Sequence, residues 1–314
     1  MPAWSGRVGE PGGLRLDRYT AEELGLLSRS QVKARKLEAR VNGRAVKVSR
    51  LLKLGDFLEL SWEEAQPDDL VPEDIPLDII YENERVIVVN KAQGMVVHPG
   101  SGNFRGTLAN ALLYRRLQYG TIGTCAGGLR PGIVHRLDKD TSGVMIAAWD
   151  EAALAFLQEQ FRERTVRKTY AALVRGAPPR VRGRIETRIV RDPRNRKLFT
   201  VSADRGKAAL TLYRLVWTRQ AYSLLLLRPR TGRTHQIRVH LRHLGCPILG
   251  DPLYGREDPR FLHAGLMLHA AALCVRLPGE VPPGEVPPGE VAQQRFRAPL
   301  PARFREIFEC LASL

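Results

Sequence analysis

The chain has 314 residues, and a hydrophobic fraction of 44% is large enough to bury an ordinary core, which excludes a wholly disordered protein. A prior of about 150 residues per domain predicts two domains. Lys and Arg outnumber Asp and Glu by 49 to 33, and the net charge of +16 favours a polyanionic partner, nucleic acid before a membrane surface.

No apolar run approaches the roughly 20 residues that span a bilayer. Met1–Gly13 is polar and glycine-rich, which is not the pattern of a signal peptide. The four cysteines, Cys125, Cys246, Cys274 and Cys310, form no C-x-x-C pair, so we expect neither a zinc site nor a disulfide framework. These features predict a cytoplasmic protein without a membrane segment.

The first predicted domain covers residues 14–62 and is small and basic. Apolar residues recur at helical spacing over 16–27, and Ser28 is placed as the N-cap of a second helix that ends at Lys36. Asn42-Gly43 is a turn signal between two strands. The expected strands are 39–41, 45–48 and 57–60.

An acidic, proline-containing segment at 63–75 is expected to be a linker, and the second domain is expected at 76–314. The expected strands there are 79–81, 86–90, 145–148, 169–174, 209–216 and 222–227, and the expected helices are 108–116, 151–162, 235–243 and 303–311. Because these elements follow one another without regular βαβ alternation, we predict an α+β fold with a mixed, largely antiparallel sheet. A repeated Pro-Gly-Glu-Val unit at 278–291 is expected to be a surface loop.

The densest group of chemically active residues is the segment Gly132–Gly143, which follows a glycine-rich approach at 127–132. Its glycines permit close backbone approach to a ligand, and its charged centre predicts an exposed loop. Arg136 and Lys139 should keep Asp138 ionised, and an ionised carboxylate suits a nucleophile or a base better than a general acid. The alternative is a structural carboxylate in a surface salt bridge.

A second segment turns at Thr231-Gly232 and leads into a helix with His235 in its first turn. Arg238 and Arg242 are four residues apart, so they share one helix face and would suit phosphate groups. The histidines of this segment have no carboxylate at a ligand spacing, which favours core or phosphate-contacting roles over a metal site. In a third segment, the strand at 168–174, Tyr170 either packs in the core or forms a stacking platform for a base.

Together these segments resemble the three active-site motifs of pseudouridine synthases of the RluA class. The similar motifs are His135-Arg136-Leu137-Asp138, Lys168-Thr169-Tyr170 and Gly232-Arg233-Thr234-His235-Gln236-Ile237-Arg238-Val239-His240, flanked by further similar segments at 94–100, 250–255, 268–270 and 298–301. Residues 14–60 are similar to the S4 RNA-binding domain that many members carry in front. The resemblance implies an S4-like domain followed by a pseudouridine synthase domain, and isomerisation of specific uridines in RNA to pseudouridine.

The resemblance also implies a role for each matching residue. Asp138 matches the catalytic aspartate, Tyr170 the tyrosine that stacks on the flipped-out base, and Arg233 the arginine that pairs with the aspartate. Arg136 matches the neighbour that fills the space of the flipped-out uridine, and Leu268 matches an apolar pocket wall. Further substrate contacts are expected from His135, His235 and Arg238, and RNA contacts of the S4-like domain from Arg29, Ser30, Lys33, Arg35, Lys36 and Arg44. The class implies no metal and no cofactor.

We therefore expect a monomeric rRNA pseudouridine synthase that acts on 23S rRNA. A synthase acting on tRNA and a non-catalytic RNA-binding or ribosome-assembly factor on the same fold remain open. A hydrolase acting on nucleic acid is disfavoured, because no second catalytic carboxylate or metal set accompanies Asp138. The sequence leaves open whether Asp138 attacks C6 of the ring, attacks C1′ of the ribose, or assists the formation of a glycal.

Overall fold

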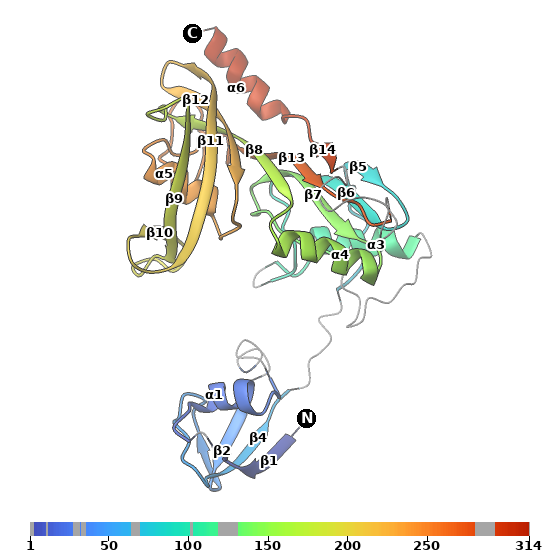
Figure 1. The fold of residues 1–314 in the computed structure, drawn as a ribbon, viewed down its shortest axis with the longest axis vertical. Helices are drawn as coiled ribbons and strands as arrows, with labels where there is room; N and C mark the ends of the chain where they lie inside the picture. Colours follow the sequence, from blue (N-terminus) through green and yellow to red (C-terminus); the bar gives the residue numbers. More distant parts are fainter. Residues whose placement is uncertain are drawn as a thin grey trace. The chain divides into compact units, whose positions relative to one another are not determined.

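The computed structural model describes residues 3–10, 12–27, 32, 36–63, 70–100, 103–118, 131–279 and 293–313. The chain divides into two compact units, Met1–Asp69 and Leu70–Leu314 (Figure 1). Several predicted features lie outside the described residues: Ser28 and most of the helix after it, the glycine-rich approach before residue 131, Cys125, and most of the Pro-Gly-Glu-Val repeat.

The first unit contains a four-stranded antiparallel sheet in the order β1-β4-β2-β3. Its elements are β1 (Ala3–Arg7), α1 (Leu16–Arg18), η1 (Tyr19–Glu23), β2 (Glu38–Val41), β3 (Arg44–Val46) and β4 (Phe57–Ser61). Leu16, Leu58 and Leu60 are almost fully buried in one core between the helical turns and the sheet. The unit therefore has an apolar core of its own.

The turn predicted at Asn42-Gly43 is confirmed as the connection between β2 and β3. Both residues have positive φ angles, 52° and 77°, as the tight hairpin turns favoured by Asn-Gly require. The side chain of Asn42 also accepts a hydrogen bond from the backbone N–H of Phe57 at 2.8 Å and donates one to Asp56 at 2.9 Å. These bonds fix the turn against the start of β4.

The second unit is built on a ten-stranded sheet in the order β10-β9-β11-β12-β8-β13-β7-β6-β5, with β14 paired to β13. Its strands are β5 (Ile79–Glu82), β6 (Val86–Lys91), β7 (Ser142–Ala148), β8 (Arg167–Arg175), β9 (Arg182–Arg191), β10 (Phe199–Ser202), β11 (Lys207–Arg219), β12 (Tyr222–Pro229), β13 (Leu268–Val275) and β14 (Gln294–Arg297). Among these strands, β13 and β7 form the parallel pair and the other pairs are antiparallel. The predicted mixed, largely antiparallel sheet is confirmed.

Helices cover both faces of this sheet. They are α3 (Leu108–Gln118), α4 (Glu151–Arg162), α5 (Gln236–His243) and α6 (Ala302–Ala312). Leu108 of α3 packs with Ile87 and Met145, whereas Leu157 of α4 packs with Val88 and Ile146. Because neighbouring residues of a strand point to opposite faces, α3 and α4 lie on opposite sides of β6 and β7.

The α5 helix packs over the other end of the sheet, where Ile237 and Leu241 join a core with Leu225 and Leu227 of β12. In Figure 1, β9, β11 and β12 run as long neighbouring strands beside α5, away from β5, β6 and β7. The sheet thus connects the segment before α5 to the loop before β7, which are far apart in the sequence.

Candidate active site

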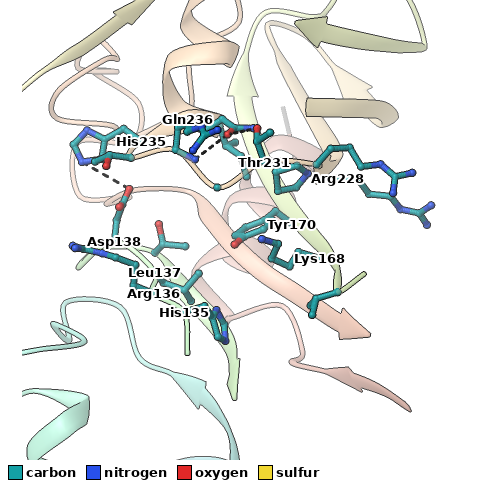
Figure 2. A pocket seen from close by; sticks show the side chains of 18 of the residues that line it. His135, Arg136, Leu137, Asp138, Lys168, Tyr170, Arg228, Thr231, His235 and Gln236 are labelled. Carbon is teal, nitrogen blue, oxygen red and sulfur yellow. Dashed lines mark hydrogen bonds and ion pairs between the residues drawn. The ribbon is translucent and has the colours of Figure 1, made fainter. Parts of the chain in front are cut away.

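One cavity of about 440 Å³ gathers residues from the loop before β7, the end of α4, the start of β8 and the segment from the end of β12 into α5 (Figure 2). A cavity of this volume is within the range of ordinary small-ligand sites. All the catalytic and substrate-binding residues predicted from the sequence line it: His135, Arg136, Asp138, Tyr170, Arg233, His235, Arg238 and Leu268.

The loop that carries Asp138 is fixed at both ends by backbone contacts. Gly132 has a φ of 30°, and a Cβ atom there would lie 1.9 Å from the carbonyl oxygen of Ala148, so this close approach requires glycine. The backbone N–H of Thr141 bonds to the carbonyl of Asp138 at 3.1 Å and closes a turn just before β7. Asp138 therefore lies on a rigid turn.

Lys91, at the end of β6, supports the same loop from behind. Its Nζ atom donates hydrogen bonds to the carbonyl oxygens of Ala92 and Met95 at 2.8 Å and of Lys139 at 3.0 Å. Only 1% of Lys91 is exposed, and this burial lowers its pKa to about 8, against the opposing charges of Asp140 and Asp138. A buried cation therefore lies beneath the loop, satisfied by backbone carbonyls.

The carboxylate of Asp138 lies in the cavity with 24% of its side chain exposed. Its Oδ2 atom is 3.4 Å from Nη1 of Arg238 and 3.9 Å from Nε2 of His235. Figure 2 shows His235 directly above Asp138, with Tyr170 across the cavity. Both neighbours belong to the segment around the start of α5, so this segment supplies the charge environment of Asp138.

Arg238 is held in place by a second carboxylate. Its Nε and Nη2 atoms donate to the two oxygens of Asp251 at 2.8 and 2.7 Å, a bidentate pair of the kind that fixes a guanidinium plane. Asp251 is fully buried and also accepts backbone N–H bonds from Leu253 and Tyr254. Although burial opposes the charge on Arg238, these bonds and the charges of Asp251 and Asp138 raise its pKa, so it stays cationic.

His235 is oriented by Tyr254. Its Nδ1 atom lies 2.8 Å from the Tyr254 hydroxyl, which also accepts the N–H of Phe199 at 2.9 Å. When the Tyr254 hydroxyl donates a hydrogen bond to Nδ1, the ring proton lies on Nε2. This proton then faces the carboxylate of Asp138, which accepts hydrogen bonds and donates none, so the geometry favours this tautomer. Burial lowers the pKa of His235 more than the charge of Asp138 raises it, so the imidazole is neutral at pH 7.

The cation that contacts Asp138 is Arg238 and not Arg233, which corrects the pairing expected from the sequence. Arg233 precedes α5 and donates through Nε to the carbonyl of Ala208 on β11 at 3.1 Å. The guanidinium of Arg238, which we expect from the sequence to suit a phosphate group, is buried and paired with Asp251. His235 likewise does not lie in the first turn of the helix: it is the N-cap residue, with a φ of 53°.

Gln236, the first residue of α5, anchors the segment before the helix. Its side-chain oxygen accepts from Thr231 Oγ1 at 2.7 Å and from the N–H of Arg233 at 3.0 Å. Its amide nitrogen donates to the carbonyl of Leu210 at 3.1 Å and to Thr211 Oγ1 at 3.0 Å. This buried network ties the cavity wall to β11 and holds His235 in a left-handed conformation that non-glycine residues adopt rarely.

Tyr170 of β8 and His135 of the loop before β7 both line the cavity. Burial, and to a lesser extent the charge of Asp138, raises the pKa of Tyr170, so its hydroxyl stays neutral. The Nε2 atom of His135 accepts the N–H of Ile146 at 3.1 Å, and its ring stacks on Phe161 with centroids 4.7 Å apart. Burial lowers the pKa of His135 to about 3, so this imidazole is neutral as well. Leu268 is 3% exposed and contributes an apolar wall.

Of the residues expected to bind RNA in the first unit, Lys36 and Arg44 are described. Lys36 is exposed and forms an ion pair with Glu63 at 2.6 Å, and Arg44 is exposed at the start of β3. Arg29, Ser30, Lys33 and Arg35 lie outside the described residues.

Comparison with known proteins shows the family of the chain. A family model described as RNA pseudouridylate synthase matches residues 85–243. The chain belongs to the RNA pseudouridylate synthase family. A protein of Borreliella burgdorferi named ribosomal large subunit pseudouridine synthase D is 47% identical over 83% of this chain and 81% of that protein. A protein of the same name from Zymomonas mobilis is 41% identical over 78% of each.

A solved structure, human RNA pseudouridylate synthase domain containing 4, is also similar to this synthase, with a TM-score of 0.59 and 27% identity over 75% of this chain and 93% of that one. The chain is therefore an RNA pseudouridine synthase, an isomerase with the fold of that family. No helix in the described parts of the chain is long and apolar enough to cross a membrane. Within the same parts, no cluster of His, Cys, Asp and Glu is suited to hold a metal ion.

Sequence reasoning assigned no role to Asp251 and Tyr254, although their segment was singled out. The signal was present, since an Asp and a Tyr between the glycines at 250 and 255 suggest a polar turn. It could not show that this turn lies under α5. Lys91 and Gln236 were missed as well, because each joins a nearby segment to a distant one: Lys91 bonds to Lys139, and Gln236 bonds to Leu210 and Thr211.

Proposed function

We propose that this synthase isomerises uridines of large-subunit rRNA, with Asp138 as the catalytic carboxylate. The observation that carries the proposal is the Asp138 carboxylate beside Arg238 in a cavity that also holds the ring of Tyr170. Two relatives whose printed names are ribosomal large subunit pseudouridine synthase D match most of the chain, which supports rRNA as the substrate.

The reaction detaches uracil at N1, turns it and rejoins it through C5, so the base must stay in the site throughout. A stacked uridine cannot reach Asp138, and flipping it out costs a few kcal/mol. Stacking on the Tyr170 ring would return about 1–3 kcal/mol. Arg238 pairs with Asp138 and fixes the orientation of its carboxylate, as a nucleophile or base requires.

The charge of the cavity supports an RNA substrate. The described lining residues contain one carboxylate, Asp138, and many cations: Arg136, Arg164, Arg167, Lys168, Arg228, Arg230, Arg233 and Arg238. Arg238 is engaged by Asp251, but Arg136, Arg167, Arg228 and Arg230 are exposed. Exposed arginines around a base-sized cavity are suited to the phosphates on either side of a flipped nucleotide. We assign to Arg136, two residues before Asp138 in the chain, the filling of the gap that the flipped uridine leaves.

We assign the first unit to RNA binding as an S4-like domain. Two short helical turns pack on a small antiparallel sheet with its own core, and the sequence of this unit is similar to that domain. Lys36 and Arg44 are exposed cations on this unit. They would add electrostatic affinity for RNA without sequence preference.

The substrate is tested by incubating the purified protein with unmodified transcripts of 23S rRNA and of tRNA and mapping pseudouridine at single-nucleotide resolution. We expect modification of a small number of uridines in the rRNA and none in the tRNA. Modification of tRNA alone would contradict the rRNA assignment and favour the synthase acting on tRNA. Absence of pseudouridine from both, with RNA binding retained, would favour a non-catalytic RNA-binding role.

A further inference from the structure

The sheet of the second unit carries a group of arginines on the face opposite α5. The pairing β9–β11–β12 places Arg184, Leu212 and Arg228 in one row, and Arg182, Arg214 and Leu226 in the next. On the other face, the alternate residues Ile185, Thr211 and Tyr213 are buried beneath α5 or bonded to it. We call the exposed arginines of the first face the outer arginine face; they are Arg182, Arg184, Arg188, Arg214 and Arg228.

The charges on this face are not balanced from within the sheet. Arg182 and Arg214 are directly opposite each other on neighbouring antiparallel strands, where side chains are about 4.5–5.5 Å apart at Cβ and like charges destabilise the pair. Among the described residues of β9, β11 and β12, Glu186 is the acidic residue on this face, and it forms an ion pair with Arg184. A bound anion that contacts both Arg182 and Arg214 would offset their repulsion and so explain why the sheet carries this pair.

The outer arginine face is continuous with the catalytic cavity. Arg228, at the end of β12, belongs to both, since it pairs with Leu212 across the sheet and lines the cavity. Arg230, two residues further along the chain, also lines the cavity and is exposed. Figure 2 shows the side chain of Arg228 extending away from Asp138 and Tyr170, toward the outside of the site.

We propose that the outer arginine face binds the phosphate backbone of the substrate RNA beyond the target uridine. An RNA strand that leaves the cavity past Arg228 would reach Arg214 and Arg182 on the next two strands. Guanidinium groups bind phosphate in bidentate geometry and are less strongly hydrated than lysine ammonium groups, which suits such a track. The proposal rests on the proposed function for its RNA substrate, but it concerns affinity and not the chemical step.

The test compares the double variant R182Q/R214Q with the control R295Q/R305Q. The control removes two exposed arginines of the same unit that neither line the cavity nor lie on the outer arginine face. Both doubles lower the net charge equally. Two probes are used: an unmodified 23S rRNA transcript, and a short uridine-containing oligonucleotide that fills the cavity alone. Dissociation constants are measured over a series of salt concentrations, with pseudouridine formation and thermal unfolding measured on the same samples.

We expect R182Q/R214Q to weaken binding of the transcript about tenfold and to reduce its log–log salt slope by about two, one for each lost phosphate contact. Turnover of the short oligonucleotide and the unfolding temperature should not fall, since the variant removes a like-charge pair. Equal behaviour of the two doubles, or an equal loss of affinity for both probes, would overturn the proposal. If the wild-type protein modifies tRNA instead, the rRNA assignment fails. The outer arginine face is then tested by comparing R182Q/R214Q with R295Q/R305Q on a tRNA transcript.

Discussion

The Nη1 atom of Arg238 lies 3.4 Å from Oδ2 of Asp138, and this contact joins α5 to the loop before β7. The same guanidinium is held by both oxygens of Asp251. Arg238 therefore links the buried turn at Asp251 to the carboxylate of Asp138, on which the proposed chemistry depends.

Replacing Arg238 by Gln should lower the rate of pseudouridine formation on the order of 100-fold, because a preorganised charge partner of the reacting group is lost. It should also cost about 3–5 kcal/mol of stability, because Asp251 is left as an uncompensated buried charge. The double variant R238Q/D251N should regain stability, since the buried charge is removed, without regaining activity. Activity of R238Q equal to that of the wild-type protein would contradict the assignment of Arg238.

The sequence predicted the elements of the second unit well where apolar periodicity is strong. The predicted strands at 86–90 and 145–148 lie within β6 and β7, and the predicted helix at 151–162 is α4. The strands it missed are β9, β10, β13 and β14. The Arg-rich segment of β9 looks solvated in the sequence, although Ile185 and Ile189 are buried between exposed neighbours. The cause is physical: a strand with one exposed face can carry many charges there without losing its buried face.

The choice between Arg233 and Arg238 could not be made from the sequence. Both belong to the same motif, and either side chain is long enough to reach a neighbouring loop. The outcome depends on where α5 begins, since Gln236 starts the helix and leaves Arg233 in the preceding segment, and on Asp251, which approaches from a third segment. Local patterns do not contain such contacts, whereas the grouping of Asp138, Tyr170 and the arginine motif followed from the family resemblance.

Gln236→Leu should lower the rate of pseudouridine formation by more than its effect on folding explains. The substitution removes the bonds that hold Thr231 and Arg233 and leaves buried donors unpaired, at a cost of about 1–3 kcal/mol. The matched control is Gln160→Leu, because Gln160 is equally buried and bonds to both backbone groups of Arg276, outside the cavity. Equal kcat values for the two variants, measured well below their unfolding temperatures, would show that Gln236 has no positioning role.

Stability should fall as the pH decreases from about 6.5 toward 4. Burial lowers the pKa values of His240 and His269 to about 4, from an ordinary value of 6.5. Below pH 6.5 the unfolded chain therefore binds protons that the folded protein excludes, and each histidine contributes up to about 1.4 kcal/mol per pH unit in this window. Denaturant unfolding between pH 7 and pH 5 measures the slope. H240Q should reduce it, and the exposed control H263Q should not; a slope unchanged by H240Q would contradict the prediction.

Tyr170→Phe should retain affinity for RNA that contains the target uridine, whereas Tyr170→Leu should lose about 10- to 100-fold. The ring supplies the stacking energy of about 1–3 kcal/mol, and the hydroxyl is neutral at pH 7 because burial raises the pKa of Tyr170. Equilibrium binding of an RNA carrying an unreactive uridine analogue separates affinity from turnover. Equal affinities of the Phe and Leu variants would exclude a stacking role.

The role of Asp138 is tested most directly by pseudouridine formation in Asp138→Asn, which keeps the shape of the side chain and removes its charge. We expect this variant to bind the rRNA transcript with nearly wild-type affinity and salt dependence, because a carboxylate adds no phosphate contact. We expect no detectable pseudouridine even after prolonged incubation in single-turnover conditions. Pseudouridine formation by Asp138→Asn at a rate above that of the same RNA incubated without protein would remove Asp138 from the mechanism.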